Sequence, residues 1–262
     1  MKRFNIKSLL LISALLLAST AKTYSAGEQA APLKVDWSFK GITGKFDRAS
    51  LQRGFQVYKE VCSSCHSMQY LSYRNLGEPG GPEFSQVEVK AIAASVEITD
   101  GPDDQGEMFT RPGRPADKFK NPYPNVKASI AANGGAYPPD MSVLVKARPG
   151  GSNYIYSVLV GYEDPPAGVT LDDGVYYNKY MIGNKIKMSS PLSDDIVEYS
   201  DGTQATVDQM AKDVTTFLSW SAEPELEERH RTGVKVIIYL ILLTTLVYLS
   251  MKKIWSRVDT EV

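Results

Sequence analysis

Three of the four cysteine and histidine residues of this sequence lie within five consecutive positions. Cys62, Cys65 and His66 belong to the segment CSSCH, whereas His230 lies far away in a charged stretch. Two thiols three positions apart, followed at once by a histidine, form the attachment pattern of c-type haem, in which the thiols bond to the porphyrin and the imidazole binds the iron. The segment therefore predicts one covalent haem c on Cys62 and Cys65, with His66 as an axial ligand.

Three other kinds of site use the same residue types. A thioredoxin-like redox pair requires a βαβ setting, which the preceding residues do not indicate. A zinc site needs four ligands, and the fourth available residue would be the remote His230. A disulfide between Cys62 and Cys65 would close a loop too short to remove much chain entropy from the unfolded state. Haem attachment is the favoured interpretation.

A haem that only transfers electrons has a second axial ligand, usually histidine or methionine. His230 is read more simply as a solvated side chain among charges. Met68 is too close to His66 to cross the ring, and Met210 lies on an apolar helix stripe typical of core packing. Met188 follows the loop 182–187 and is the best placed to fold over a haem face. Spacing alone also leaves open its rivals Met108, Met141 and Met181.

The first 26 residues predict a secretory signal peptide. Basic residues precede the apolar run 8–18, and small and polar residues follow it, with cleavage expected between Thr20 and Gly27. The run is too short for a membrane-spanning helix, which needs about 20 apolar residues. The body of the chain is therefore expected to be exported.

The segment 233–251 reads GVKVIIYLILLTTLVYLSM and predicts a transmembrane helix. A buried core helix is the alternative, but here every face is apolar. Basic residues flank both ends, so the signal peptide decides the orientation. We expect an exported domain at 27–231, an anchor at 232–253 and a cytoplasmic tail at 254–262.

Composition predicts one medium-sized domain with long loops. The chain has 262 residues, of which 43% are hydrophobic, together with 20 glycines and 15 prolines. Its net charge is only −1 and no basic stripe occurs, which argues against a nucleic-acid partner.

Periodicity predicts two helices within this domain. One covers 47–62 with Asp47 as N-cap, and the other covers 206–220 with Thr206 and Gln209 as a capping box. Residues 154–162 are compatible with a strand or a helix. Prolines throughout 112–139 indicate an extended, wrapping segment.

Several long segments resemble the cytochrome c1 family. They are VCSSCHSMQYLSYRNL, NGGAYPPDMS, ARPGGSNYIYSVLVGY, YYNKYMIGNKIKMSSPL, DGTQATVDQMAKDVTTFLSWSAEPE and the single C-terminal span. The resemblance covers most of the chain and implies a mainly α, cytochrome c-like haem domain with long loops plus one transmembrane helix. It implies covalent haem at Cys62 and Cys65, with His66 and Met188 as the axial iron ligands.

The same resemblance implies roles for further residues. Arg148 would meet a haem propionate, since a guanidinium suits a carboxylate, although a solvated surface arginine is the alternative. Pro138 and Pro139 would pack in the haem wall, with an ordinary loop as the alternative. The chain lacks the extra cysteine pair that some bacterial members use as a disulfide, so packing must stiffen its loops.

The resemblance also implies the function. The chain would be an electron-transfer subunit of the cytochrome bc1 complex beside cytochrome b, taking electrons from the Rieske iron–sulfur protein and passing them to a cytochrome c. It would break no substrate bond by itself. It would lie in a bacterial inner membrane, with lipid around the anchor and the haem domain on the periplasmic side. The alternatives are a membrane-tethered cytochrome c that serves an oxidase outside such a complex, and a haem-free anchored binding protein.

An acidic run offers a docking surface for a basic cytochrome c. Its members are Glu97, Asp100, Asp103, Asp104 and Glu107, with no intervening basic residue. Such a field speeds the encounter with an oppositely charged partner. A solvated acidic loop without a docking role is the alternative.

Overall fold

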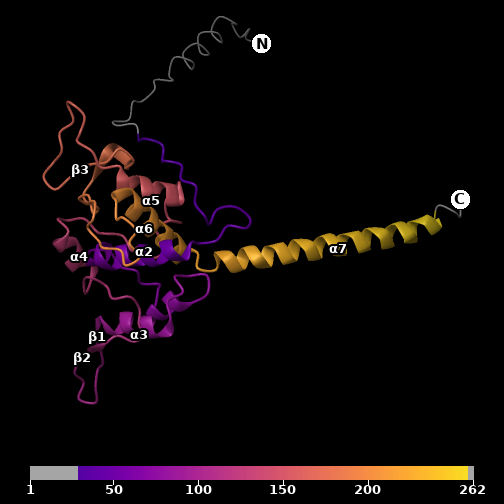
Figure 1. Cartoon of the computed structure of the whole chain (residues 1–262), viewed down its shortest axis with the longest axis horizontal. Coiled ribbons are helices and arrows are strands. Elements are labelled where there is room, and N and C mark those ends of the chain that lie inside the picture. The colour runs from indigo at the N-terminus through magenta and orange to yellow at the C-terminus, as the bar shows by residue number, and fades with distance from the viewer. Residues whose placement is uncertain (1–28, 259–262) are drawn as a thin grey trace, which may run out of the picture.

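A single long helix leaves one side of a helical body (Figure 1). The structure is a computed structural model that describes residues 29–258, so the expected signal peptide lies outside the described residues. The predicted class, mainly α with long loops and one apolar C-terminal helix, is confirmed. The helices are α2 (Arg48–Glu60), α3 (Gln86–Ala94), α4 (Val126–Ala132), α5 (Gly151–Val160), α6 (Val207–Ala222), α7 (Leu226–Val258) and the 3₁₀ turns η1 (Cys62–Ser64), η2 (Tyr73–Gly77) and η3 (Ile182–Asn184).

Two small antiparallel hairpins complete the fold. The first pairs β1 (Glu97–Asp100) with β2 (Phe109–Pro112), and the second pairs β3 (Tyr176–Tyr177) with β4 (Lys185–Ile186). They lie at opposite ends of the body (Figure 1). The acidic run therefore belongs to a projecting hairpin, whose strands the sequence did not predict.

Helices α2 and α6 form the centre of the body. Asp47 caps α2 as predicted, since its side chain accepts from the Ser50 amide at 3.0 Å. The helices cross closely at Gly54, where a Cβ atom would lie only 2.1 Å from the Asp213 carbonyl oxygen. Arg53, on the same turn, donates from Nε to Asp213 at 2.8 Å, so an ion pair closes the crossing. A glycine is required there because any side chain would push the helices apart.

Helix α6 supplies much of the hydrophobic core. Met210, Phe217 and Leu218 are fully buried, which confirms the predicted stripe and the core position of Met210. Thr206 caps the helix by accepting from the Gln209 amide at 3.2 Å. The predicted capping box is only half formed, because the Gln209 side chain donates to Asp213 instead.

The ambiguous segment 154–162 folds mainly as helix α5. Gly150 precedes the helix with φ of +87°, a left-handed conformation that favours glycine. The buried hydroxyls of Ser152 and Ser219 lie 2.9 Å apart and join α5 to α6. The segment 112–139 is largely irregular, as its prolines predicted, but it also contains the short helix α4, which Asn125 caps.

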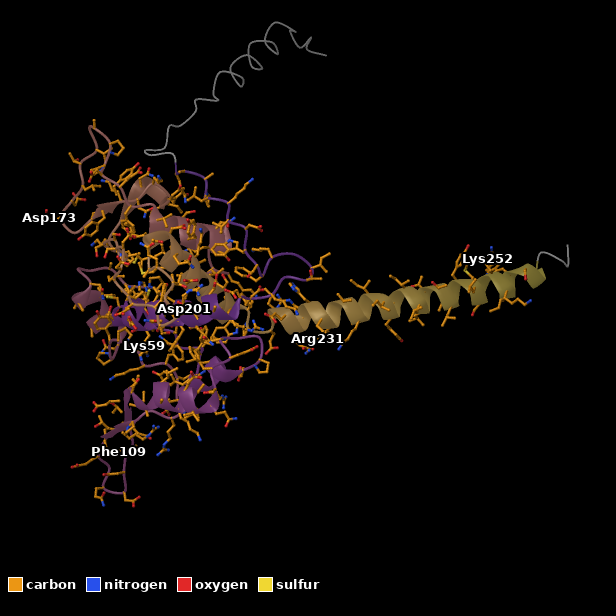
Figure 2. The ribbon with its side chains drawn as sticks, viewed as in Figure 1. Lys59, Phe109, Asp173, Asp201, Arg231 and Lys252 are labelled. Atoms are coloured by element: carbon orange, nitrogen blue, oxygen red, sulfur yellow. The ribbon has the colours of Figure 1, made fainter. Side chains whose placement is uncertain are left out.

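Helix α7 is long and apolar enough to cross a membrane. Its candidate span is Leu226–Ser256, and the apolar part is not buried in the protein. Arg231 lies near its beginning and Lys252 near its end (Figure 2), as expected where a helix meets lipid headgroups. Glu227 fixes the helix to the body by accepting from Arg48 Nη1 at 2.7 Å and Nη2 at 2.9 Å.

Candidate haem site

The CSSCH segment folds as one tight turn directly after α2. The amide of His66 donates to the carbonyl of Cys62 at 2.9 Å, and the amide of Cys65 donates to the same oxygen at 3.2 Å. The turn therefore places Cys62, Cys65 and His66 together just beyond the end of α2, a helix with one buried face. Cys62 is buried, Cys65 is half-buried, and neither forms a disulfide. Burial raises the pKa of the Cys62 thiol to about 12, so this thiol is neutral before any bond to a porphyrin forms.

His66 is held in the state that an iron ligand requires. Its Nδ1 lies 2.8 Å from the carbonyl oxygen of Pro139, which can only accept, so Nδ1 carries the proton. The lone pair is then on Nε2. Burial lowers the pKa of His66, which favours the neutral ring. A neutral imidazole with a carbonyl partner on its second nitrogen is the usual form of a metal-bound histidine, so the residues present fit a haem iron.

The carboxylate of Asp140, the residue after Pro139, joins the Pro139 segment to the residues that follow the attachment turn. Asp140 Oδ2 accepts from the Ser67 hydroxyl at 2.8 Å and from the Gln69 amide at 2.9 Å. Its other oxygen accepts from the Ser142 amide at 2.9 Å. Burial alone would raise the pKa of Asp140, but the hydrogen bonds from Ser142, Gln69 and Ser67 outweigh it and lower this pKa.

Sequence reasoning missed Asp140, because its position in the sequence gives only one weak signal. It is an acidic residue directly after the two prolines assigned to the haem wall. Of these, Pro139 contributes its carbonyl group to His66. A contact across 73 residues of sequence could not be read from spacing.

Met188 follows the β3–β4 hairpin, which is anchored to the end of α5. The fully buried Asn178 donates to the Val158 carbonyl at 2.7 Å. Beyond α5, the Tyr162 hydroxyl donates to the Met188 carbonyl at 3.1 Å. Lys187 Nζ donates to the Gly134 carbonyl at 3.0 Å, in the segment that leads to Pro139. Met188 thus lies on a loop tied to two parts of the site, and its side chain is half-buried.

The rival methionines have other surroundings. Met108 is 60% exposed on the acidic hairpin. Met141 is buried, and its amide donates to the Ser67 carbonyl beside His66. Met181 accepts a hydrogen bond on sulfur from the Tyr154 hydroxyl at 3.2 Å. Met188 stays the predicted axial ligand, and this prediction rests on the family resemblance.

Two other candidate residues have defined partners. Arg148 is half-buried three positions before the start of α5 and donates from Nη1 to the Ala147 carbonyl at 3.0 Å. This uses one of its five N–H donors, so the propionate role stays a prediction. We expected a solvated His230, but the side chain is only partly exposed, and its Nδ1 lies 3.1 Å from the Gly44 carbonyl oxygen. It helps hold α7 against the body.

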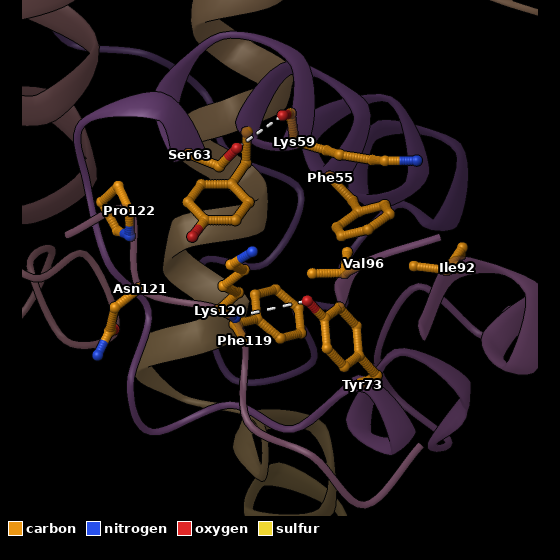
Figure 3. Close-up of a pocket in the computed structure, with 11 residues that line it drawn as sticks. Phe55, Lys59, Ser63, Tyr73, Ile92, Val96, Phe119, Lys120, Asn121 and Pro122 are labelled. Carbon is orange, nitrogen blue, oxygen red and sulfur yellow. Dashed lines mark hydrogen bonds between the residues drawn. The ribbon is translucent and has the colours of Figure 1, made fainter. Parts of the chain in front are cut away.

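An aromatic pocket of about 190 Å³ lies beside the attachment turn (Figure 3). Its walls include Tyr58, Tyr73 and Phe119, and it reaches Ser63 of the turn. Neither cysteine of the turn lines it, nor do the two predicted iron ligands. The pocket is therefore next to the candidate haem site and separate from it.

The acidic run does not present five free charges. Asp100 pairs with Arg111, which also pairs with Asp117. Asp103 accepts from the Glu107 amide at 2.9 Å and shapes the hairpin loop. The side chains of the loop are exposed, and Phe109 lies towards its projecting end (Figure 2).

Comparison with known proteins identifies relatives for almost the whole described chain. The model of the Cytochrome C1 family matches residues 37–258. The chain is 49% identical over 241 residues to cytochrome c1 of Rhodospirillum rubrum, covering 86% of this chain and 88% of that protein. It is 51% identical over 239 residues to cytochrome b/c1 of Bradyrhizobium diazoefficiens, covering 84% of this chain and 35% of that protein, so it spans about a third of that relative. It is 49% identical to the cytochrome b-c1 complex catalytic subunit of Candida albicans, covering 91% and 80%.

Proposed function

Because this chain belongs to the cytochrome c1 family, we propose that it takes single electrons from a Rieske iron–sulfur protein and passes them to a cytochrome c. It does so as a membrane-anchored electron-transfer subunit of a cytochrome bc1 complex, beside cytochrome b. Family members bind one covalent haem c, which when bound supplies reversible one-electron chemistry. The observation that carries the proposal is the His66–Pro139 hydrogen bond, which leaves Nε2 of a neutral, buried imidazole for iron.

The residues of the chain have distinct tasks in this proposal. Cys62 and Cys65 would hold the haem covalently, and His66 and Met188 would bind its iron. Methionine as the second ligand raises the potential relative to a second histidine. Exclusion of water from the haem by the surrounding protein would also help to set the potential through the local dielectric.

The membrane arrangement follows from the two chain ends. Residues 1–26 are proposed to direct export, 27–231 to form the periplasmic haem domain, 232–253 to cross a bacterial inner membrane and 254–262 to remain in the cytoplasm. The exposed apolar surface of α7 supports the anchor. N-terminal sequencing of the mature protein would test cleavage between Thr20 and Gly27. Protease digestion of spheroplasts should cut the haem domain and spare the C-terminal tail.

The main experiment is a redox titration of the detergent-solubilised protein together with its co-purifying subunits. Met188→Leu should lower the midpoint potential sharply, because a thioether ligand is lost. Met181→Leu is the matched control, since it removes a sulfur that Tyr154 already engages, and should leave the potential near the native value. An unchanged potential in Met188→Leu would remove Met188 as the ligand. Purification without cytochrome b and a Rieske protein would favour the membrane-tethered cytochrome that serves an oxidase.

A further inference from the structure

We propose that Asp140 is a positioning residue for the haem, which sets the orientation and basicity of His66 by fixing the Pro139 carbonyl group. The inference rests on the proposed ligation of iron by His66. It adds a residue that the attachment motif does not contain and that lies 74 positions further along the chain.

The Pro139 carbonyl needs external support to keep its direction. Proline has no N–H, so residue 139 cannot be held through its own amide. The next residue supplies the anchor instead, since the Asp140 carboxylate binds Ser67 and Gln69 on one oxygen and the Ser142 amide on the other. The Asp140 side chain thus joins the segment that follows His66 to the segment that follows Pro139.

Two further hydrogen bonds, each donated by a backbone amide, continue the same attachment. The Met141 amide donates to the Ser67 carbonyl at 2.8 Å, and the Tyr70 amide donates to the Ser142 hydroxyl at 3.1 Å. The carboxylate lies between these contacts and the His66–Pro139 bond. Loss of the Asp140 carboxylate would therefore loosen the contact between these two segments at the end that is nearest to the His66 imidazole.

A carboxylate is the group that this arrangement requires. Its three donors are divided between both oxygens, and the Gln69 and Ser142 donors are backbone amides that cannot reverse their role. An asparagine has one oxygen and one NH₂ group, so it must leave one of these amides unsatisfied. The segment would then shift, and the hydrogen bond from Nδ1 to Pro139 would weaken.

The predicted effect has a definite sign. A hydrogen bond from the second ring nitrogen to a carbonyl raises the basicity of a metal-bound imidazole. A more basic ligand stabilises the oxidised iron, so weakening the bond raises the midpoint potential. Loss of the negative charge of Asp140 acts in the same direction, so a variant that keeps the charge is needed to separate the two causes.

The experiment compares haem-loaded variants in the solubilised protein. Asp140→Asn and Asp140→Glu should both raise the midpoint potential and alter the pattern of haem methyl shifts in the NMR spectrum of the oxidised protein, which reports the orientation of the axial imidazole. Asp140→Glu retains the charge but moves the carboxylate. A native potential and native spectrum in Asp140→Glu, with a shifted potential in Asp140→Asn, would show that only the charge matters and would overturn positioning.

The matched control is Asp117→Asn. Asp117 also accepts three hydrogen bonds on two oxygens, but from Arg111 and the Arg114 amide. It should lower thermal stability without changing the potential or the methyl shifts. If Asp140→Asn yields too little haem protein, Ser67→Ala removes one bond to Asp140 and keeps the charge, and it should raise the potential by a smaller amount. A native potential in Ser67→Ala and Asp140→Glu would refute the inference, whereas a normal response of Met188→Leu in the same preparation would leave the proposed function intact.

Discussion

The ammonium group of Lys187 donates to the carbonyl oxygen of Gly134 at 3.0 Å, and this bond joins the Met188 loop to the segment that reaches His66. Gly134 and Pro139 belong to one stretch of chain, and each offers a carbonyl to one flank of the site. The two predicted ligands are thus connected through a shared piece of backbone. The surroundings of His66 and of Met188 should therefore respond together when this stretch is loosened.

Lys187→Ala should make methionine ligation easier to lose. Without the bond to Gly134, the Met188 loop has fewer contacts that hold it in place, so less denaturant should displace the thioether. We expect the midpoint of ligand loss, followed by haem absorption during a guanidinium titration, to fall. Lys185→Ala is the control, because Lys185 donates to the Thr170 carbonyl in the exposed segment that precedes the hairpin. Equal midpoints in the two variants would mean that the Gly134 bond does not hold the loop.

Gly54→Ala should strongly destabilise the body. The added Cβ would meet the Asp213 carbonyl at 2.1 Å, so α2 and α6 must separate. Overpacking of this kind costs about 1–3 kcal/mol or more of unfolding free energy. Thermal unfolding followed by circular dichroism measures the loss. Gly233→Ala, where the new Cβ meets no atom within 4 Å, should be close to neutral, and a similar stability of both variants would contradict the tight crossing.

Glu227→Gln should loosen the joint between the membrane helix and the haem domain. The carboxylate accepts two bonds from Arg48 and one from the Phe46 amide at 2.9 Å, and its side chain is only 17% exposed. Bonds to a charged group of this kind contribute about 1.5–3 kcal/mol, reduced here because Arg48 is partly solvated. Limited proteolysis should cut faster near residues 222–232.

Glu228, the residue next to Glu227, provides the control for this proteolysis experiment. Glu228 pairs with Arg231 on the exposed side of α7, and surface pairs contribute about 0–1 kcal/mol. Glu228→Gln should therefore be cut at nearly the native rate. Equal rates in the Glu227 and Glu228 variants would show that the Arg48 contact does not fix the helix.

Acid should weaken the contact between Arg53 and Asp201. The Thr203 amide and Arg53 hold the pKa of Asp201 at about 2, below its value of about 4 in the unfolded chain. A lowered folded pKa stabilises the protein above pH 4, and this stability is lost as the pH falls from 4 towards 2. Asp201→Asn should reduce the slope of melting temperature against pH in this window. An unchanged slope would show that Asp201 does not contribute to acid unfolding.

Neutralising the acidic hairpin should slow the reduction of a basic cytochrome c at low salt. The charges available for docking are mainly Asp103, Asp104 and Glu107, because Asp100 is paired with Arg111. Replacing these three by Asn or Gln should flatten the dependence of the bimolecular rate on ionic strength. Asp172→Asn with Asp173→Asn, on the exposed loop at the other end of the body, serves as the control. If the salt dependence stays native in the hairpin variant, the run is a solvated loop without a docking role.

Local chemistry determined much of this protein from sequence. The thiols and imidazole of CSSCH are adjacent in the chain, so their meeting in one turn needs no distant contact. The N-caps at Asp47 and Thr206 depend on the next few residues, and the apolar run of α7 depends only on composition and length. Such features are readable because their partners are close in sequence.

Tertiary structure decided the contacts that depend on distant segments. Helix or strand at 154–162 was undecided because the apolar pattern fits both, and packing of Ser152 against Ser219 accompanies the helical outcome. The role of Asp140 was invisible because a carboxylate after two prolines has no periodicity of its own. His66 acquires its tautomer from a carbonyl 73 residues away, and only the folding of the intervening chain brings that oxygen to the imidazole.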